Sequence, residues 1–248
     1  MSIHEYQNKF RQFRQTLYQN FGKRADTATE LVDALCSSPA ATSPVELSLA
    51  PVFRRSYTAL YKAMAEVKWQ NLPLAELVAG SLTSPKRREF WLLGIDVTSQ
   101  PRPFARTLTD RGYVYHPNAL AGNKPVTIGH QYSTVALLPE KEEGVTASWV
   151  VPLSTQPVST EADKELVGAR QMQALLDDEA ALWHNELVVE VGDTSYSKPA
   201  YLHANRRSDN FDHRACSQQP HLLQIIRVSR RRTSSPSPSA LRRGVQAA

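Results

Sequence analysis

The sequence predicts an α/β protein in which a helical N-terminal region, residues 1–85, precedes a mixed sheet with helices in residues 86–210. Two observations support this fold class. Apolar residues recur every three or four positions through residues 3–67, which is the period of an amphipathic helix. From residue 86 on, short apolar runs dominate instead, as expected of buried strands, with one helical stripe among them.

The N-terminal region is expected to form several helices. The first is predicted over residues 3–21, because Ile3, Tyr6, Phe10, Phe13, Leu17 and Phe21 share one face. Capping boxes at Thr27–Glu30 and Ser43–Glu46 indicate two more helix starts, the second with proline at its first position. Pro51 restarts a helix whose apolar stripe continues to Val67, and a short helix is expected around 72–82. We interpret these stripes as the core of a helical domain.

The second region has the order strand, strand, strand, helix, strand. The first strand is the apolar run 90–97, and a polar, proline-rich stretch, 98–103, follows it. Further strands are predicted at 126–138, 146–153 and 187–193, and a helix at 163–178. The first and last of these strands are expected to be internal in the sheet.

The C-terminal segment, residues 211–248, differs in composition. It has no convincing period, and Ser234–Ser239 is a low-complexity run, so disorder is predicted. Residues 214–248 hold seven arginines and no acidic residue, whereas the formal net charge of the chain is +5. The first 213 residues therefore carry a net charge of −2, and the basic character comes from this segment alone.

Composition excludes several classes of protein. No apolar run approaches the ~18 residues of a membrane helix, and the N-terminus lacks the pattern of a secretory signal. The only cysteines, Cys36 and Cys216, rule out a disulfide scaffold and fit a reducing cytoplasm. The sequence has no phosphate-binding glycine loop, no dinucleotide-binding glycine motif, no zinc-protease motif and no nucleophile elbow.

Two aspartates stand where buried strands are expected to end. Asp96 closes the run that begins near Trp91, and Asp193 follows Leu187–Val191. If these strands are neighbours, both carboxylates meet at one edge of the sheet and repel each other unless a cation lies between them. Such oxygen ligands suit Mg²⁺ and two-metal phosphoryl transfer. The alternative is that each aspartate only caps a turn or a helix.

Four segments resemble bacterial insertion-sequence transposases of the DDE type. They are Gly94–Pro103, Gly129–Ser133, Ser148–Leu153 and Val189–Tyr196, and both their amino-acid sequences and their order along the chain match. The resemblance spans roughly residues 1–210 and is strongest from 86 to 210. It implies an RNase H-like catalytic core, with Asp96 and Asp193 as the first two residues of the acidic triad and as ligands of Mg²⁺ (or Mn²⁺).

The resemblance also implies the activity and the partners. The activity would be DNA transposition, by metal-dependent cleavage and strand transfer without a covalent enzyme intermediate. The partner would be double-stranded DNA, at the element ends and the target, with a possible homodimer, no membrane, and a cytoplasmic location at the nucleoid. Six basic residues are candidates for phosphate contacts, and their alternative is a solvated surface: Lys86, Arg87, Arg88, Arg102, Arg206 and Arg207.

The chain departs from the family pattern after Asp193. The third acid of the family is a glutamate on a downstream helix, but only Asp209 and Asp212 follow here, and no glutamate does. Deleting one base from the codon of Phe211 permits a frame that reads Val-Arg-Ser-Asn-Arg-Thr-Phe-Tyr, as expected of the family. We therefore expect an inactive, truncated transposase in which residues 211–248 are an out-of-frame basic tail.

Other functions remain open from the sequence. One is a non-catalytic DNA-binding regulator that competes with full-length transposase at element ends. Another is an unrelated metal-dependent nuclease or phosphotransferase of similar fold. A purely structural or interaction protein is the third, and the paired strand-end acids argue only mildly against it.

Overall fold

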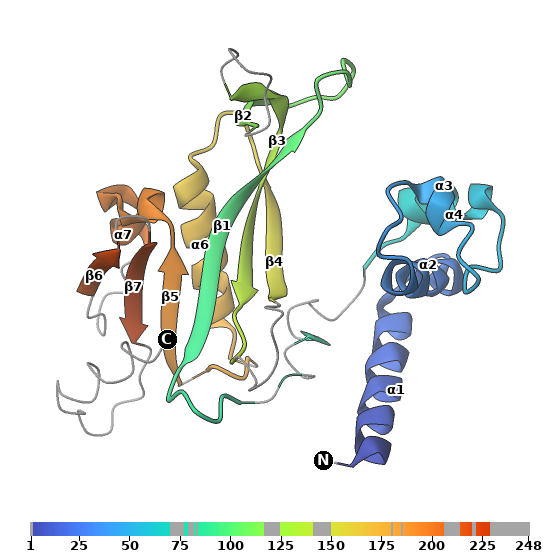
Figure 1. Cartoon of the computed structure of the whole chain (residues 1–248), viewed down its shortest axis with the longest axis horizontal. Helices are drawn as coiled ribbons and strands as arrows, with labels where there is room; N and C mark the ends of the chain where they lie inside the picture. Colours follow the sequence, from blue (N-terminus) through green and yellow to red (C-terminus); the bar gives the residue numbers. More distant parts are fainter. Residues whose placement is uncertain are drawn as a thin grey trace. The chain divides into compact units, whose positions relative to one another are not determined.

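The computed structural model of the chain describes residues 2–69, 77–78, 82, 84–116, 125–140, 150–179, 181–184 and 186–205, and the backbone of 214–219 and 222–228. The chain divides into two compact units, residues 1–82 and 83–248 (Figure 1). The fold is mixed α/β, with helices first and a mixed sheet after them, so the predicted fold class is confirmed.

The first unit is helical, with α1 (Ile3–Asn20), α2 (Ala25–Ser37), α3 (Pro44–Leu47) and α4 (Tyr57–Glu66). Its small core gathers the apolar faces of the last three helices and their connections around five buried residues: Ala34, Leu47, Ala50, Phe53 and Leu60. The helix predicted at 72–82 lies largely outside the described residues.

Helix starts in this unit differ in part from the prediction. Ser43 caps α3 as expected, because its Oγ accepts a hydrogen bond from the Glu46 N–H. The capping box at Thr27 is wrong: α2 already begins at Ala25, after Arg24 in the left-handed conformation (φ 60°), and Thr27 is buried inside the helix. The turn 51–56 delays the next helix to Tyr57.

The core assignment of α1 also needs correction. Only Leu17 and Asn20 are buried on this helix, whereas Ile3, Tyr6 and Phe10 are exposed. Within the first unit, the N-terminal turns of α1 extend beyond the other helices, as Figure 1 shows. The helical period is as predicted, but the N-terminal half of the apolar stripe, Ile3, Tyr6 and Phe10, is exposed and not part of the core of this unit.

The second unit is built on one sheet. Its strands are β1 (Trp91–Pro101), β2 (Gly112–Tyr115), β3 (Val126–Leu137), β4 (Val151–Val158), β5 (Leu187–Gly192), β6 (Arg214–Gln219) and β7 (Leu222–Val228). The order is β2-β3-β1-β5-β7-β6, with β4 also paired to β3. Strand β3 runs antiparallel to β1 and β4, and β5 runs parallel to β1. This arrangement is consistent with an RNase H-like core.

Helix α6 (Lys164–Asp177) packs across β1, β3 and β4. Alternate residues of β1, Trp91, Leu93 and Ile95, are buried on the side that faces this helix. Gly168 of α6 allows a close approach here, because a Cβ at this position would lie 2.6 Å from Ile95 Cδ1. The short elements η1 (Thr194–Ser197) and α7 (Pro199–Ala204) follow β5.

Four features of the sheet differ from the sequence prediction. Strand β4 covers Val151–Val158, whereas the prediction was 146–153, of which residues 146–149 lie outside the described residues. Strand β1 continues through the polar stretch to Pro101, because its backbone pairs with β3 as far as Gly129. The short strand β2 was not predicted. Strands β6 and β7 lie in 211–248, where disorder was expected; β7 is rich in leucine and isoleucine and pairs with the whole length of β5.

Candidate active site where β1 and β5 part

The two predicted aspartates come level with each other across neighbouring strands. The last parallel pair joins Gly94 of β1 to Val191 of β5. Continued two residues beyond this pair, the same register would bring Asp96 opposite Asp193. A Cβ on Gly192 would lie 3.2 Å from Ile95 Cγ2, so the two chains are still adjacent there. Neighbouring strands lie about 4.8 Å apart, and residues in register point to the same face.

Both carboxylates are exposed and locally held. Asp96 Oδ1 accepts a hydrogen bond from the Val97 N–H at 2.7 Å. Asp193 caps η1, since its Oδ1 accepts from the backbone N–H and the hydroxyl of Ser195. Within the described part of the chain, no hydrogen bond is made by Oδ2 of either residue. The capping role expected as the alternative is therefore real for Asp193, and it leaves one oxygen of the side chain for a ligand.

Tyr196 is a buried side chain close enough to both aspartates for their charges to affect its pKa. Its ring contacts the positions of Gly192 and Gly168, where added Cβ atoms would approach it to 2.9 and 3.1 Å. Burial raises the pKa of its hydroxyl, and the negative charges of Asp96, Asp193 and Glu165 raise it further. The hydroxyl faces Ser133 Oγ, but neither oxygen completes a hydrogen bond of good geometry with the described residues.

An ion pair between an exposed lysine and a buried glutamate fixes the segment after Asp193. Glu165, at the start of α6, is almost fully buried and accepts a hydrogen bond from Lys198 Nζ. This bond and the charge of Glu165 raise the pKa of Lys198, and the nearby charges of Asp163 and Asp193 act in the same direction. Lys198 is thus a cation held close to the candidate site, and the sequence prediction did not include it.

A second buried carboxylate anchors α7. Glu190 of β5 accepts hydrogen bonds from the Tyr201 hydroxyl and from Asn205 Nδ2, and all three side chains are buried. Tyr196 and Tyr201 also meet edge to face, with ring centroids 5.0 Å apart. The segment that follows Asp193 is therefore held against α6 by Lys198 and against β5 by Tyr201 and Asn205.

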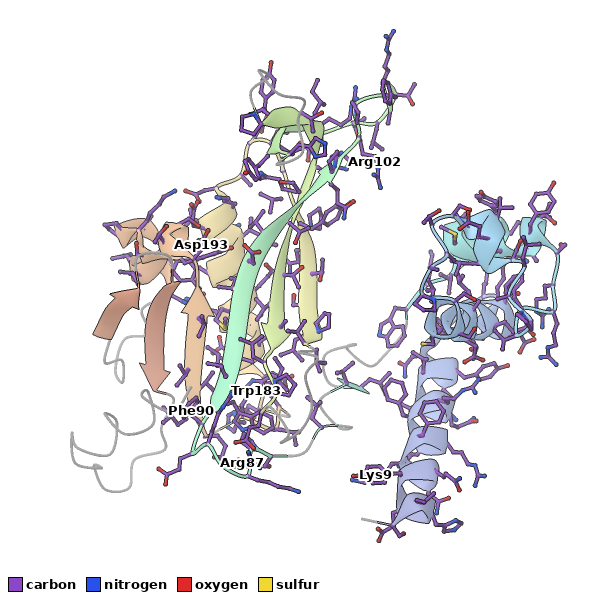
Figure 2. All side chains as sticks on the ribbon, in the orientation of Figure 1. Lys9, Arg87, Phe90, Arg102, Trp183 and Asp193 are labelled. Atoms are coloured by element: carbon purple, nitrogen blue, oxygen red, sulfur yellow. The ribbon has the colours of Figure 1, made fainter. Side chains whose placement is uncertain are left out.

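Of the six predicted DNA-contacting residues, the four that the structure describes lie at two opposite ends of β1. Lys86, Arg87 and Arg88 precede β1, and their three backbone N–H groups bind the Glu140 carboxylate. Arg102 follows the other end of β1, so Figure 2 shows Arg87 and Arg102 at opposite ends of the sheet, with Asp193 between them. Arg206 and Arg207 lie outside the described residues.

Not every one of these cations is available to a ligand. The Arg88 guanidinium donates to the Leu138 carbonyl and lies over the Phe90 ring, with 5.9 Å from Cζ to the ring centroid. His130 and Tyr132 make structural contacts on β3, since His130 Nε2 pairs with the Thr109 carbonyl and the two rings meet edge to face.

The described residues contain no group of three histidine, cysteine or acidic side chains that could hold a metal ion. The site therefore consists of two level, exposed carboxylates, one nearby lysine and a buried tyrosine, at the end of a parallel strand pair in an RNase H-like sheet. This combination of fold and acids is consistent with a nuclease-type core.

Comparison with known proteins gives the family. The family model for DDE superfamily endonucleases matches residues 16–211, so the chain belongs to this family and the predicted resemblance is confirmed. No curated protein and no solved structure is significantly similar to the chain. None of the described helices combines the length and the apolar character needed to span a membrane.

Proposed function

We propose that the protein acts in DNA transposition, by divalent-metal-dependent cleavage at the ends of an insertion sequence and transfer of the cut strand to a target. The observation that carries the proposal is the register of β1 and β5, which sets two exposed carboxylates level in a chain of the DDE endonuclease family. The substrate is double-stranded DNA, and the protein is proposed to work at the nucleoid.

Asp96 and Asp193 are the proposed ligands, and Mg²⁺ or Mn²⁺ is the proposed metal. Proteins often hold Mg²⁺ with only one or two carboxylates, while waters and phosphate oxygens complete its shell, so the exposed pair fits this ion. When bound, a metal of this kind would activate a water molecule or a DNA 3′-hydroxyl for attack and would stabilise the leaving oxygen. Ser195 orients the Asp193 carboxylate, and Lys198 provides a cation for a DNA phosphate near it.

The chain of 248 residues is proposed not to cleave DNA by itself. A third acidic ligand completes the site in this family, and no glutamate follows Asp193 in this sequence. The same observation favours a second candidate, a non-catalytic regulator that occupies element ends. Preferential binding to DNA from the borders of its own element, over random DNA of equal length, would support the regulator. Equal affinity for the two DNAs would exclude it.

The proposed metal site is tested by thermal unfolding with and without Mg²⁺ or Mn²⁺. DNA nicking is measured in the same buffers and is expected to be absent; nicking that Asp193→Asn abolishes would contradict the proposal that the chain does not cleave by itself. Metal that binds only the folded state should raise the unfolding midpoint of the wild type, and Asp193→Asn should abolish the rise. Glu89→Gln, an exposed change at the other end of β1, is the matched control and should retain it.

The same pair of variants has a second readout without metal. Two level carboxylates repel each other, so Asp193→Asn should unfold at the same temperature as the wild type or higher. Asparagine can still accept the hydrogen bond from the Ser195 N–H, which keeps the cap of η1. A metal-induced rise that survives Asp193→Asn would contradict the assignment of this residue as a ligand.

A homodimer is the proposed assembly, and the exposed stripe Ile3, Tyr6 and Phe10 on α1 is the surface that would carry it. Sedimentation of the full chain should then show a dimer that Phe10→Asp dissociates. Lys9→Asp, on the same helix but outside the stripe, is the control. A wild type that remains monomeric at high concentration would contradict this assembly.

A further inference from the structure

The loop from Arg102 to Arg111, which joins β1 to β2, presents an aromatic side chain to solvent. Phe104 is 93% exposed, the most exposed of the large apolar side chains described. Tyr113, which follows on β2, is 84% exposed. Burial in the fold therefore does not explain the aromatic character of these two positions.

The backbone of the loop is held in place by hydrogen bonds within the loop. The Arg111 guanidinium donates to the carbonyls of Leu108, Arg102 and Arg106, at 3.2, 3.0 and 3.4 Å. One arginine thus closes the turn from three directions, and the segment that bears Phe104 is held between its contacts.

The loop is also fastened to the sheet. The Arg102 N–H donates to the Ile128 carbonyl at 2.8 Å, and His130 pairs with the Thr109 carbonyl. Asp110, in the left-handed conformation, accepts from Ser159 Oγ and from the N–H and hydroxyl of Thr160. These bonds lower the pKa of the Asp110 carboxyl, with the Thr160 N–H as the main cause. A rigid base of this kind lets an exposed side chain bind without a large ordering cost.

The ribbon next to the loop carries further apolar side chains on one face. The register pairs Tyr113 with Ile128 and Tyr115 with Val126, and all four are exposed, whereas Val114 between the tyrosines is buried. Arg102 and Arg106 stand on the loop itself, and within the described residues neither forms an ion pair. The Arg102 guanidinium donates one hydrogen bond, to the Pro101 carbonyl at 2.9 Å, and keeps its other N–H groups for a ligand. Aromatic faces beside arginines without an ion-pair partner match nucleic acid, in which bases stack and phosphates carry the charge.

We propose that the Arg102–Arg111 loop binds unpaired bases of DNA: Phe104 stacks on a base, and Arg102 and Arg106 contact the flanking phosphates. A regular duplex hides its base faces, so an exposed ring on a fixed loop selects DNA that is frayed, nicked or single-stranded. This inference rests on the proposed function, because it takes the DNA to be the substrate of Asp96 and Asp193.

The position of the loop along β1 sets the bound base apart from the proposed active site. Arg102 and Asp193 belong to the same unit, with Arg102 beyond the end of β1, as seen in Figure 2. From Asp96 to Pro101 the strand advances about 17 Å at ~3.3 Å per residue. The loop begins at this distance from Asp96, so the base that it binds is separated from the phosphate that reacts and is not the base next to it.

The test uses the full chain and two DNA probes, a blunt duplex and the same duplex with a single-stranded end that carries 2-aminopurine. The wild type should bind the second probe about tenfold more tightly and quench the 2-aminopurine fluorescence on stacking. Phe104→Ala and Phe104→Leu should remove both effects, while Phe104→Trp should keep them. Leucine is the matched control for apolar area, since it lacks only the aromatic face.

The arginines have a different expected signature. Arg106→Ala should weaken binding to both probes alike and lower the slope of affinity against salt by about one ion. Unchanged unfolding midpoints would verify that the exposed substitutions leave the fold intact.

Three outcomes overturn the inference. If Phe104→Ala binds both probes as the wild type does, the loop is not a base-stacking site, although the proposed function stands. If Phe104→Ala instead changes the oligomeric state, the loop is a contact between copies of the chain. If the wild type binds neither probe, the proposed function fails together with the inference.

Discussion

At the scale of single residues, Tyr196 carries the most specific expectation. Its ring fills the space between Ile95, Gly168 and Gly192, and its hydroxyl is buried without a well-formed hydrogen bond to the described residues. Burying a polar group without a partner costs free energy, whereas the ring itself contributes apolar packing. Ring and hydroxyl therefore have opposite effects on stability.

Two variants separate these effects. Tyr196→Phe keeps the ring and should leave the free energy of unfolding unchanged or raise it by about 1 kcal/mol. Tyr196→Ala leaves a cavity under both aspartates and should lower the free energy of unfolding by about 3–5 kcal/mol. Urea unfolding measures both. If Tyr196→Phe lowers stability by more than about 1 kcal/mol, the hydroxyl has a partner, and Tyr196 is part of a polar network.

At the scale of elements, the pairing of β1 with β3 depends on the missing side chain of Gly129. A Cβ there would lie 2.2 Å from the Gln100 carbonyl oxygen and 2.9 Å from Pro101 Cα. Both are backbone atoms, so one strand must move to accommodate alanine. Gly129→Ala should therefore destabilise the protein by roughly 2 kcal/mol and loosen the adjacent loop that holds Phe104.

Gly94→Ala is the matched control in the same strand pair. The Cβ added at this position meets only side-chain atoms of Leu138, the nearest at 3.2 Å, and that side chain can shift. Its cost should be smaller than that of Gly129→Ala when both are measured by urea unfolding. Equal costs would mean that β1 and β3 approach each other less closely at Gly129 than the register implies.

Elements with a strong apolar signal could be predicted from the sequence. The apolar run before Asp96 predicted β1, and the run after Glu186 predicted β5. The apolar stripe between them predicted α6. The polar end of β1 has no apolar pattern that would predict a strand, because its pairing depends on Gly129 in β3, far along the sequence. Strand β2 was missed because its tyrosines face solvent and only Val114 is buried.

The candidate site could be predicted only in part, for a related reason. Asp96 and Asp193 each follow a buried run, so their place beside two buried strands could be inferred from local pattern. The predicted strand end is correct only for Asp193, because β1 continues past Asp96 to Pro101. Lys198 reaches the site through its bond to Glu165, a contact between residues far apart in sequence. No periodicity indicates such a contact, and an exposed lysine reads as solvated surface.

At the scale of the whole molecule, two views of residues 211–248 make opposite predictions. An out-of-frame tail contributes nothing to the fold, so its removal is harmless. In the structure, however, β7 pairs with β5 from Leu187 to Gly192, and β6 pairs with β7. Removing them would leave the backbone N–H and C=O groups along one edge of β5 unpaired, and such an edge promotes association with other chains.

Truncation at two points distinguishes these views. A chain that ends at residue 228 keeps β6 and β7 and should unfold at the same temperature as the full protein. A chain that ends at residue 210 loses both strands, so its unfolding midpoint should fall by roughly 5 °C or more and it should aggregate on heating. If both truncated chains match the full protein in calorimetry and light scattering, the segment is passive, and the pairing of β7 with β5 does not stabilise the sheet. If only the shorter chain fails, residues 214–228 complete the sheet edge beside the strand that carries Asp193, whatever the origin of their reading frame.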